Sequence, residues 1–347
     1  METKIVKITK LNNDAKEKLR QAAAILSFGG LVVMPTETVY GLGGDATNEN
    51  AAKKIYEAKG RPSNNPLIIH IADPRDAEEY CHTSPLYYKL AKAFMPGPLT
   101  VIMQKKDTIP TSVTGGLDTV AVRCPDHKVA NALIRAFGKP IAAPSANISG
   151  RPSPTCAKYV IEDLCGHVDM IIDGGECEIG LESTIVKIDG DTMTLLRPGA
   201  VTHDALTMVC EKVKIADAVT DKLKEGETVL SPGMMYRHYS PNTPVVLLDG
   251  DDGRFIDFIL SEQQRTAGKC GVICYDGEEK FIGENNVITI GKKDDLASHG
   301  KHIFTALREA DTFGAEIIYA HLPPKEGLGL ALYNRMIRAA AHTVKKI

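Results

Sequence analysis

Residues 14–44 read DAKEKLRQAAAILSFGGLVVMPTETVYGLGG and decide the fold class. Apolar side chains recur at helical spacing over residues 14–28, and the glycine pair that follows stops a helix. The next five residues, 31–35, form an apolar, β-branched run that is typical of a buried strand. A helix followed at once by a buried strand, repeated along the chain, predicts an α/β protein rather than an all-helical or all-β one.

The alternation of strands and helices continues to about residue 215. Two apolar runs at 183–197 are separated by hairpin-like spacing, which indicates antiparallel partners, so the first sheet is predicted to be mixed. Further strands are predicted at 67–71, 99–104, 119–123, 141–143, 170–173, 183–188 and 193–196, and helices at 49–59, 85–94, 128–137 and 155–164.

The composition changes between residues 216 and 244. Residues 216–227 are polar and charged, and residues 231–244 (SPGMMYRHYSPNTP) combine turn formers with Met, Tyr and His. The Pro and Gly content predicts a linker. Because an inert spacer would lack the apolar and aromatic side chains of residues 231–241, we interpret that stretch as a lid over a nucleotide. The alternative is that its aromatic residues pack two domains together.

A second block of alternating elements follows the linker. This pattern is typical of a small Rossmann-like domain with a parallel sheet between helical layers. The predicted organisation is an α/β domain at 1–215, a linker or lid at 216–244 and a second α/β domain at 245–347. In the second domain, strands are predicted at 245–248, 271–275, 287–290 and 316–320, and helices at 254–264, 294–314 and 328–345.

The composition of the 347 residues limits the classes of function. The length suggests about two domains. The net charge of −3, the aromatic content of 5% and the absence of Trp argue against a broad nucleic-acid surface. No run of 18 apolar residues could span a bilayer, and the N-terminus does not resemble a signal peptide. The eight scattered cysteines form no Cys-x-x-Cys pair, so we expect reduced thiols in a cytoplasmic protein without membrane contact.

Cations gather at predicted strand ends and in loops. Arg123 and Arg197 end strands, whereas Lys59, Arg61 and Arg151 are assigned to loops. A guanidinium fork and a lysine point charge both suit phosphate oxygens. So many cations at strand ends indicate an anionic ligand, although Lys-x-Arg by itself is also typical of a solvated surface. As exposed loop cations, Lys59 and Arg61 are expected to contribute little to folding.

Small hydroxyl residues and glycines follow other predicted strands. Residues 34–44 run from a strand into a glycine-bearing turn, and residues 143–155 run into a helix expected to start near Thr155. Backbone N–H groups and hydroxyls at a helix N-terminus bind anions, although the same residues also cap ordinary loops. The chain has no P-loop motif. His299 and His302 have metal-like spacing without an evident third ligand, which favours a pair of surface histidines.

Seven short motifs follow one another along the chain: PTETVYGL at 35–42, KGRP at 59–62, PLIIH at 66–70, PGPLT at 96–100, RCP at 123–125, PSANISG at 144–150 and ESTIV at 182–186. This ordered set resembles the YrdC family over about residues 10–210. The segments SPGMMYRHYSP at 231–241 and EGLGLALYNR at 326–335 resemble the long form of that family, which has an added C-terminal domain. One motif would be a weak signal, but the ordered set is specific.

The resemblance implies a YrdC-like twisted mixed sheet and a synthase that makes threonylcarbamoyl-AMP from L-threonine, bicarbonate and ATP, releasing pyrophosphate. Downstream tRNA threonylcarbamoyltransferase machinery would use the product to modify adenosine 37 of tRNA. Mg²⁺ would bridge the ATP phosphates, with no metal held by the protein itself. By resemblance, the catalytic residues are Lys59, Arg61, Ser145 and Asn147; ATP is held by Lys59, Arg61, Asn65, Thr119, Asn147, Thr155 and Arg197; and L-threonine is held by Thr38, His70, Arg123, Ser145 and Ser183. The interpretation of residues 231–241 as a lid adds Tyr236 to the ATP-binding set.

Two other functions stay open at this point. YrdC-like modules also occur in enzymes that use carbamoyl phosphate, but the additional regions of those enzymes carry Cys-x-x-Cys pairs, which this sequence lacks. The chain could instead be an RNA-binding regulatory module without adenylating activity, with weak RNA contact on a basic concave face. Salt-dependent RNA binding without adenylate formation would favour this alternative.

Overall fold

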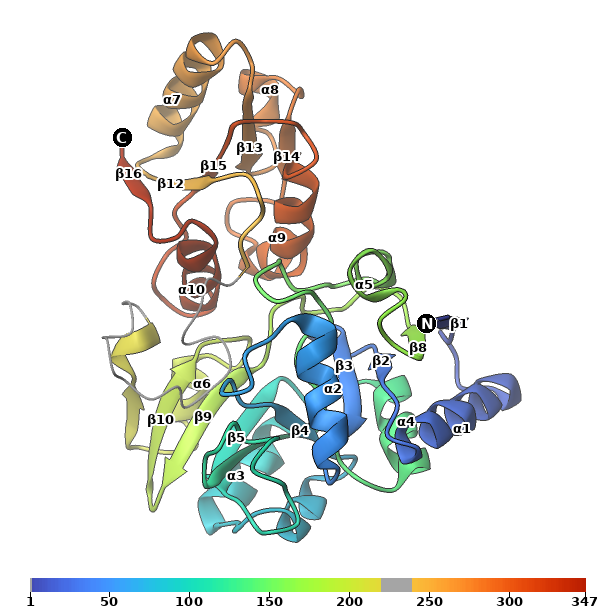
Figure 1. Ribbon diagram of the computed structural model, residues 1–347. Helices are drawn as coiled ribbons and strands as arrows, with labels where there is room; N and C mark the ends of the chain where they lie inside the picture. Colours follow the sequence, from blue (N-terminus) through green and yellow to red (C-terminus); the bar gives the residue numbers. More distant parts are fainter. Residues whose placement is uncertain (1, 220–238) are drawn as a thin grey trace. The chain divides into compact units, whose positions relative to one another are not determined.

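The computed structural model describes residues 2–219 and 239–347 (Figure 1). These residues cluster into two compact units, and the short segment Gly150–Ser153 groups with the C-terminal unit rather than with its sequence neighbours. Most of the predicted linker or lid, including Tyr236, lies outside the described residues. The domain limits drawn from the sequence, and the lid itself, therefore stay predictions.

The first unit is built on a mixed sheet of 11 described strands. Their order in the sheet is β1-β8-β2-β3-β7-β4-β6-β5-β9-β10-β11. β4 and β6 are parallel, whereas β9 and β10 are antiparallel, which confirms the mixed sheet predicted from the sequence. The strands are β1 (Lys4–Lys7), β2 (Val32–Met34), β3 (Gly41–Asp45), β4 (Ile68–His70), β5 (Leu99–Gln104), β6 (Thr119–Arg123), β7 (Ile141–Ala142), β8 (Met170–Asp173), β9 (Thr184–Asp189), β10 (Thr192–Arg197) and β11 (Val213–Ile215).

Helices cover both faces of this sheet, because successive residues of a strand point to opposite faces. Val32 and Met34 pack with α1 and α4, whereas Leu31 and Val33 pack with α2, α3 and α5 on the other face (Figure 1). The helices of the first unit are α1 (Asn13–Ser27), α2 (Glu49–Lys59), α3 (Pro85–Phe94), α4 (Lys128–Phe137), α5 (Ala157–Leu164) and α6 (His203–Thr207), with the 3₁₀ helices η1 (Pro74–Glu79) and η2 (Asp217–Val219).

Helix α2 shows how local sequence signals position a site residue. The Asn48 side chain accepts two backbone N–H bonds at the N-terminus of the helix, and Gly60 ends the helix in the left-handed conformation at φ 59°. Ile55, Tyr56 and Lys59 lie on the buried side of the helix. Since Ile55 and Lys59 are four residues apart, the apolar stripe that anchors α2 also directs Lys59 inward.

The glycine-bearing turn predicted within residues 34–44 is partly wrong, because β3 occupies Gly41–Asp45. A Cβ atom on Gly43 would lie 2.7 Å from a methyl carbon of Ile141 and 2.9 Å from the carbonyl oxygen of Val32. Glycine is therefore required for β3 to fit between β2 and β7. The glycines of this segment indicate close packing of backbones rather than a turn alone.

The second unit contains a five-stranded sheet among the described residues, and every strand pair in it is parallel. This confirms the small parallel α/β fold predicted from the sequence. The strand order is β14-β13-β15-β12-β16, and α7 and α8 pack on one face of the sheet. The elements are β12 (Val245–Asp249), α7 (Asp252–Arg265), β13 (Cys270–Cys274), α8 (Glu279–Ile282), β14 (Val287–Thr289), α9 (Leu296–Ala310), β15 (Ile317–His321), α10 (Gly329–Ala339) and β16 (Val344–Lys346).

The helix predicted at 328–345 is wrong in its last third, because α10 ends at Ala339. Ala341 and His342 adopt positive φ angles of 47° and 64°, which a continuing helix does not allow. The chain then turns back, and Val344–Lys346 forms β16 beside β12. A short alternation of a β-branched residue with lysines gave too little sequence signal to distinguish this edge strand from the end of a helix.

The predicted surface pair of histidines is also wrong. The residue surface of His299 is only 3% exposed; its ring stacks on Tyr275 at 4.9 Å, and its Nε2 lies 2.8 Å from the carbonyl oxygen of Lys292. His302 is exposed. His299 and His302 are three residues apart, so they lie near the same face of α9. The packing of α9 in the second unit nevertheless buries only His299.

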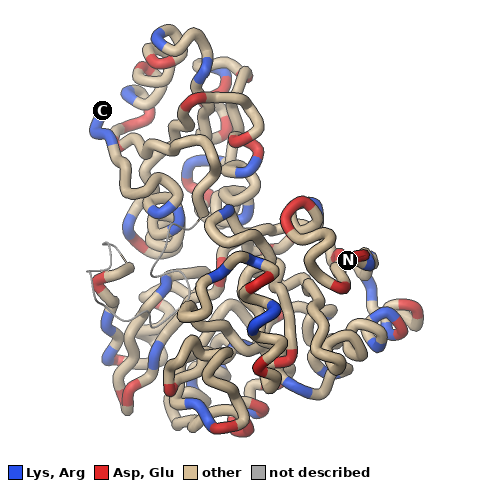
Figure 2. The backbone as a smooth tube through the Cα atoms, in the orientation of Figure 1, with Lys and Arg blue, Asp and Glu red and all other residues tan. Residues whose placement is uncertain are grey.

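The charged residues of each unit are mixed in sign. Figure 2 shows acidic and basic positions interspersed along both units. None of the described helices combines the length and hydropathy needed to cross a bilayer. All eight cysteines lie in the described ranges, and none of them is in a disulfide.

Candidate active site

The carboxyl ends of two adjacent parallel strands hold the first predicted site residues. β4 ends at His70 and β6 ends at Arg123, and the strand register places these two residues side by side. β5 runs antiparallel on the other side of β6 and pairs Thr100 with Arg123. All three residues are buried. The fold thus brings together His70 and Arg123, both of which the resemblance assigns to L-threonine.

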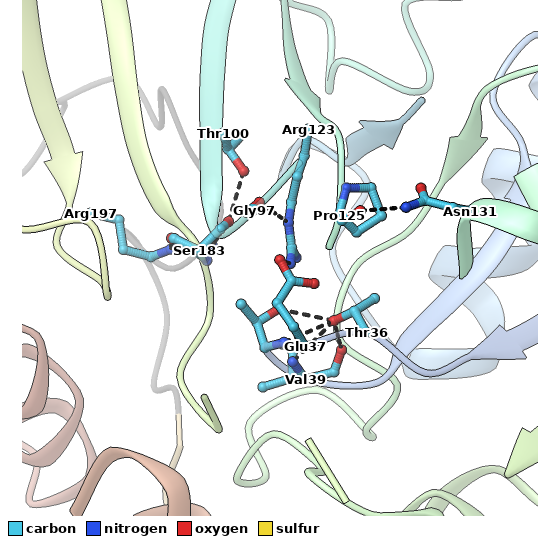
Figure 3. Close-up of polar contacts among 11 residues, drawn as sticks. Thr36, Glu37, Val39, Gly97, Thr100, Arg123, Pro125, Asn131, Ser183 and Arg197 are labelled. Carbon is cyan, nitrogen blue, oxygen red and sulfur yellow. Dashed lines mark hydrogen bonds and ion pairs between the residues drawn. The ribbon is translucent and has the colours of Figure 1, made fainter. Parts of the chain in front are cut away.

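Ser183 and Arg197 continue this polar group (Figure 3). The hydroxyl oxygens of Ser183 and Thr100 lie 2.7 Å apart. Arg197 donates from Nη2 to the Ser183 hydroxyl at 3.2 Å and from Nε to the Ser183 carbonyl oxygen at 3.0 Å. Ser183 belongs to the predicted threonine set and Arg197 to the predicted ATP set, so the two sets of residues meet here.

Glu37 is a site residue that the sequence analysis did not single out. It lies in the loop after β2, and its Oε1 is 2.6 Å from Nη2 of Arg123 (Figure 3). Only 5% of the surface of each side chain is exposed. A single acidic residue in a loop carries no local signal of a site, and its cationic partner is far away in the sequence. The PTETVYGL motif that contains Glu37 was the one available hint.

Several buried polar atoms of this group have no hydrogen-bond partner among the described residues. They are both carboxylate oxygens of Glu37, Nη2 of Arg123 and Nδ1 of His70; Oδ1 of Asn65, at the other end of the strands, is also without a partner. The Glu37–Arg123 contact is therefore an ion pair without hydrogen-bond geometry. A buried polar atom left unsatisfied costs about 1–3 kcal/mol. Such a concentration of unsatisfied atoms indicates a place that a polar ligand completes.

His70 is neutral at physiological pH. Burial, and after it the nearby positive charge of Arg123, lower the pKa of its imidazole to about 3. A neutral imidazole can donate one hydrogen bond and accept another. A neutral ring of this kind suits hydrogen bonding to a ligand rather than neutralisation of its charge.

Lys59 is not the exposed loop cation that the sequence predicted. It is the last residue of α2 and is 2% exposed, and its Nζ donates to the carbonyl oxygens of Ser145 and Asn147. Ser145 in turn donates from its hydroxyl to the side-chain oxygen of Asn147. The two predicted motifs, KGRP and PSANISG, thus meet through this lysine. A buried ammonium that bonds to backbone carbonyls also stabilises the loop that holds it.

Arg61, Asn65 and Thr119 lie at the other end of the same strands. Arg61 donates to the carbonyl oxygens of Asn65 and Pro66 at 3.3 Å and 3.1 Å. Thr119 is the first residue of β6, and Arg123 is the last. At about 3.3 Å per residue, the two are roughly 13 Å apart along the strand. The structure therefore separates Thr119 and Arg61 from the Arg123 group by the length of β6.

The remaining predicted residues fall at the edges of these groups. Thr38 is fully buried, and its hydroxyl lies 3.0 Å from that of Thr36. Thr155 is buried and precedes α5, which begins at Ala157 and not at Thr155. Tyr236 lies outside the described residues. The assignment of individual residues to ATP or threonine stays a prediction.

Two family models match the chain. The Sua5–YciO–YrdC model, described as "Telomere recombination", matches residues 24–199. The model described as "Threonylcarbamoyl-AMP synthase, C-terminal domain" matches residues 201–341. Together they cover the polar group described above and most of the second unit.

Full-length relatives agree with these matches. The threonylcarbamoyl-AMP synthase of Pyrococcus abyssi is 43% identical over 95% of this chain and 96% of its own length. The enzyme of the same name from Bacillus subtilis is 43% identical over 94% of each chain. The crystal structure of Pyrococcus abyssi Sua5 in complex with L-threonine superposes with a TM-score of 0.91 at 41% identity, covering 99% of this chain and 100% of that one.

Proposed function

The chain belongs to the threonylcarbamoyl-AMP synthase family, and from this premise we propose that it converts L-threonine, bicarbonate and ATP into threonylcarbamoyl-AMP and pyrophosphate. The solved Pyrococcus relative in complex with L-threonine supports threonine as a substrate here. The product would carry the threonylcarbamoyl group for adenosine 37 of tRNA, and downstream transferase machinery would consume it.

The observation that carries the proposal is the buried polar group around Arg123. An amino acid carboxylate pairs well with a guanidinium that has an unused donor, and Nη2 of Arg123 has no hydrogen bond among the described residues. The hydroxyl of Ser183 and the neutral ring of His70 stand next to it. These groups suit the hydroxyl of a small β-hydroxy amino acid.

The ATP end of the proposed site is the set of cations, hydroxyls and amides named from the family motifs. Lys59 and Asn147 are joined by hydrogen bonds, and Arg61 orders the loop that contains Asn65. Thr119, Thr155 and Arg197 complete this proposed set. We expect ATP oxygens to hold Mg²⁺, because they are hard ligands that suit the ion and leave little need for protein carboxylates. The ion would neutralise charge on the phosphates.

The proposed reaction needs positioning and charge neutralisation more than a covalent nucleophile. The amine of L-threonine becomes a carbamate, and a carbamate oxygen then attacks the α-phosphorus of ATP. The bond from that phosphorus to the bridging oxygen breaks, and pyrophosphate leaves. Both reactants are anionic, so cations on either side of the reacting atoms lower the barrier.

The proposal is tested by measuring pyrophosphate release from purified protein with Mg²⁺ present. Release should require L-threonine, bicarbonate and ATP together, and L-serine should replace L-threonine only weakly. A missing methyl group in a pocket is worth about 1–3 kcal/mol. Equal release without threonine would overturn the proposal, as would activity that is indifferent to bicarbonate.

A further inference from the structure

We propose that Glu37 receives the ammonium group of L-threonine and takes its proton when the carbamate forms. The inference rests on the proposed function, because it assigns a role within that reaction. Within the part of the chain that the structure describes, Glu37 is the one acidic side chain ion-paired with Arg123. Neither carboxylate oxygen of Glu37 has a hydrogen bond among the described residues.

The loop around Glu37 is rigid enough to hold a catalytic carboxylate. The Thr36 hydroxyl donates to the carbonyl oxygen of Val39 at 2.6 Å and accepts from the backbone N–H of Val39 at 3.2 Å. The carbonyl oxygen of Glu37 accepts from the backbone N–H of Ile179 at 2.8 Å. Glu37 is 4% exposed. Its backbone is therefore fixed while its carboxylate oxygens stay available as acceptors.

The Glu37–Arg123 pair matches the charges of an amino acid zwitterion. L-Threonine carries a carboxylate and an ammonium on the same carbon, and the protein offers a guanidinium and a carboxylate 2.6 Å apart. Insertion of the substrate would replace one buried ion pair with two, and each new pair could form hydrogen bonds. Charge-assisted hydrogen bonds are about twice as strong as neutral ones. The ion pair therefore favours the binding of a zwitterion over that of a ligand with only one of the two charges.

The groups around Glu37 favour it over His70 as the proton acceptor. The charged or titratable side chains that interact electrostatically with Glu37 are Arg123 on β6, His127 at the N-terminus of α4 and Cys177 in the loop after β8. Protonation of His70 would create a second buried cation beside Arg123, whose charge already opposes it. Protonation of Glu37 creates no charge. The substrate carboxylate then takes over the pairing with Arg123.

The proposed step is balanced in atoms and charge. The ammonium of L-threonine passes one proton to the Glu37 carboxylate, which becomes a neutral carboxylic acid. The free amine attacks the carbon of bicarbonate and forms the C–N bond. A C–O bond of bicarbonate breaks, and hydroxide leaves with the second amine proton as water. The product is the carbamate of threonine, ready to attack ATP.

The first test compares the binding of two ligands to Glu37→Gln by calorimetry, without ATP or bicarbonate. The ligands are L-threonine and its α-hydroxy analogue (2S,3R)-2,3-dihydroxybutanoate, which lacks the ammonium. L-Threonine should bind the variant at least about tenfold more weakly than it binds the wild type, whereas the analogue should bind both proteins within about twofold. Equal losses for both ligands, or no loss for L-threonine, would overturn the role in binding.

Asp45→Asn is the matched control. Asp45 is a buried carboxylate on the same sheet, ion-paired with Lys139 at 3.1 Å and bonded to the Thr47 hydroxyl at 2.6 Å. Its substitution should leave the affinity for L-threonine unchanged. If Glu37→Gln does not fold, the proposal can still be tested on the wild type alone. The wild type should bind L-threonine at least about tenfold more tightly than the analogue. Equal affinities for the two ligands would contradict the proposal.

The second test concerns the proton. At saturating L-threonine, the turnover of Glu37→Gln should rise with pH relative to the wild type, because solvent increasingly supplies the free amine that Glu37 otherwise generates. A ratio of variant to wild-type turnover that is constant with pH would exclude the role as base. If the wild type binds L-threonine as described but releases no pyrophosphate, the proposed function fails while the ammonium subsite stands.

Discussion

Two buried glutamates, one in each unit, differ in how their charge is satisfied. Glu278 in the second unit accepts hydrogen bonds from the backbone N–H of Tyr275 at 2.8 Å and from Nε2 of His321 at 2.9 Å. The His321 ring is itself stacked between Phe255 at 3.5 Å and Tyr275 at 4.3 Å. Glu37 in the first unit has only its ion pair with Arg123. Both residues are buried, with 4% of the surface exposed for Glu37 and 8% for Glu278.

The difference separates a structural carboxylate from a functional one. Burial of a polar group is stabilising on balance only when its hydrogen bonds are made. Glu278 meets that condition within its own unit. Glu37 does not, and the polar atoms near it are unsatisfied in the same way. Among the described residues, the buried side-chain atoms without hydrogen bonds all lie in the first unit, and those of Glu37, His70 and Arg123 lie together at the strand ends.

The largest effect is expected for Arg123→Leu. Pyrophosphate release should fall at least about a thousandfold, because the substrate carboxylate loses its guanidinium partner. The free energy of unfolding should fall by about 3–5 kcal/mol, since Glu37 is left buried without a counter-charge. Chemical denaturation and a pyrophosphate assay measure the two effects separately.

The double variant Glu37→Leu/Arg123→Met is the control for that result. Replacement of both members of a buried pair by apolar residues is often neutral or stabilising. We therefore expect near wild-type stability with no activity. If Arg123→Leu alone is as stable as the wild type, the ion pair is not buried in the way described here.

A smaller effect is expected at Lys59. Lys59→Ala should lower the rate about tenfold or more, equivalent to about 1.4 kcal/mol. It should also cost about 1–3 kcal/mol of stability, because the carbonyl oxygens of Ser145 and Asn147 lose a donor. Arg61→Ala, at a half-buried loop position, should lower the rate similarly with a smaller change in stability. Equal stability losses in the two variants would contradict this distinction.

Glu278→Gln tests the claim that the carboxylate of Glu278 is structural. The variant should lose about 1–3 kcal/mol of stability, because one amide oxygen cannot serve both Tyr275 and His321 as the carboxylate does. L-Threonine affinity and pyrophosphate release should stay within about twofold of wild type. A loss of threonine affinity in a folded variant would show that the two units are not separated in function as argued.

The smallest effect at neutral pH is the pH dependence of stability at His70, which grows only in acid. Its pKa is lowered from 6.5 to about 3 in the folded protein, so the unfolded chain takes up the proton first as pH falls. The stability that His70 contributes is therefore complete above about pH 6.5 and is lost as pH falls towards 3, by up to about 1.4 kcal/mol per pH unit. Denaturation of wild type and His70→Gln across this range should converge in acid. Parallel curves would contradict the lowered pKa.

Elements with strong local signals could be predicted from the sequence. α2, with its Asn48 cap and Gly60 stop, occupies the predicted residues, as does α3, which begins with Ser84 and Pro85. β3 was missed because its glycines serve close packing, which depends on Ile141 in a distant strand. Local sequence signals therefore predict helices and strands such as α2 and α3. They do not predict a strand such as β3, whose glycines are needed for close contact with distant parts of the chain.

The residues of the candidate site also divide into those that local sequence predicts and those that depend on contacts between distant segments. The cations and hydroxyls at strand ends could be predicted because they belong to recognisable motifs. The burial of Lys59 and the pairing of Glu37 with Arg123 could not, since both depend on segments that the fold brings together from distant parts of the chain. Residue types indicated an anionic ligand, but only the structure reveals which polar atoms lack a partner.

The most direct test of the central claim is a crystal structure of this chain with L-threonine. The threonine carboxylate should lie within hydrogen-bond distance of Nη2 of Arg123, at about 2.7–2.9 Å, with the ammonium at the same distance from the Glu37 carboxylate. The unsatisfied atoms of Glu37 and Arg123 would then all have partners. Threonine bound elsewhere, with the Glu37–Arg123 contact intact, would contradict the claim that these buried atoms mark the substrate site.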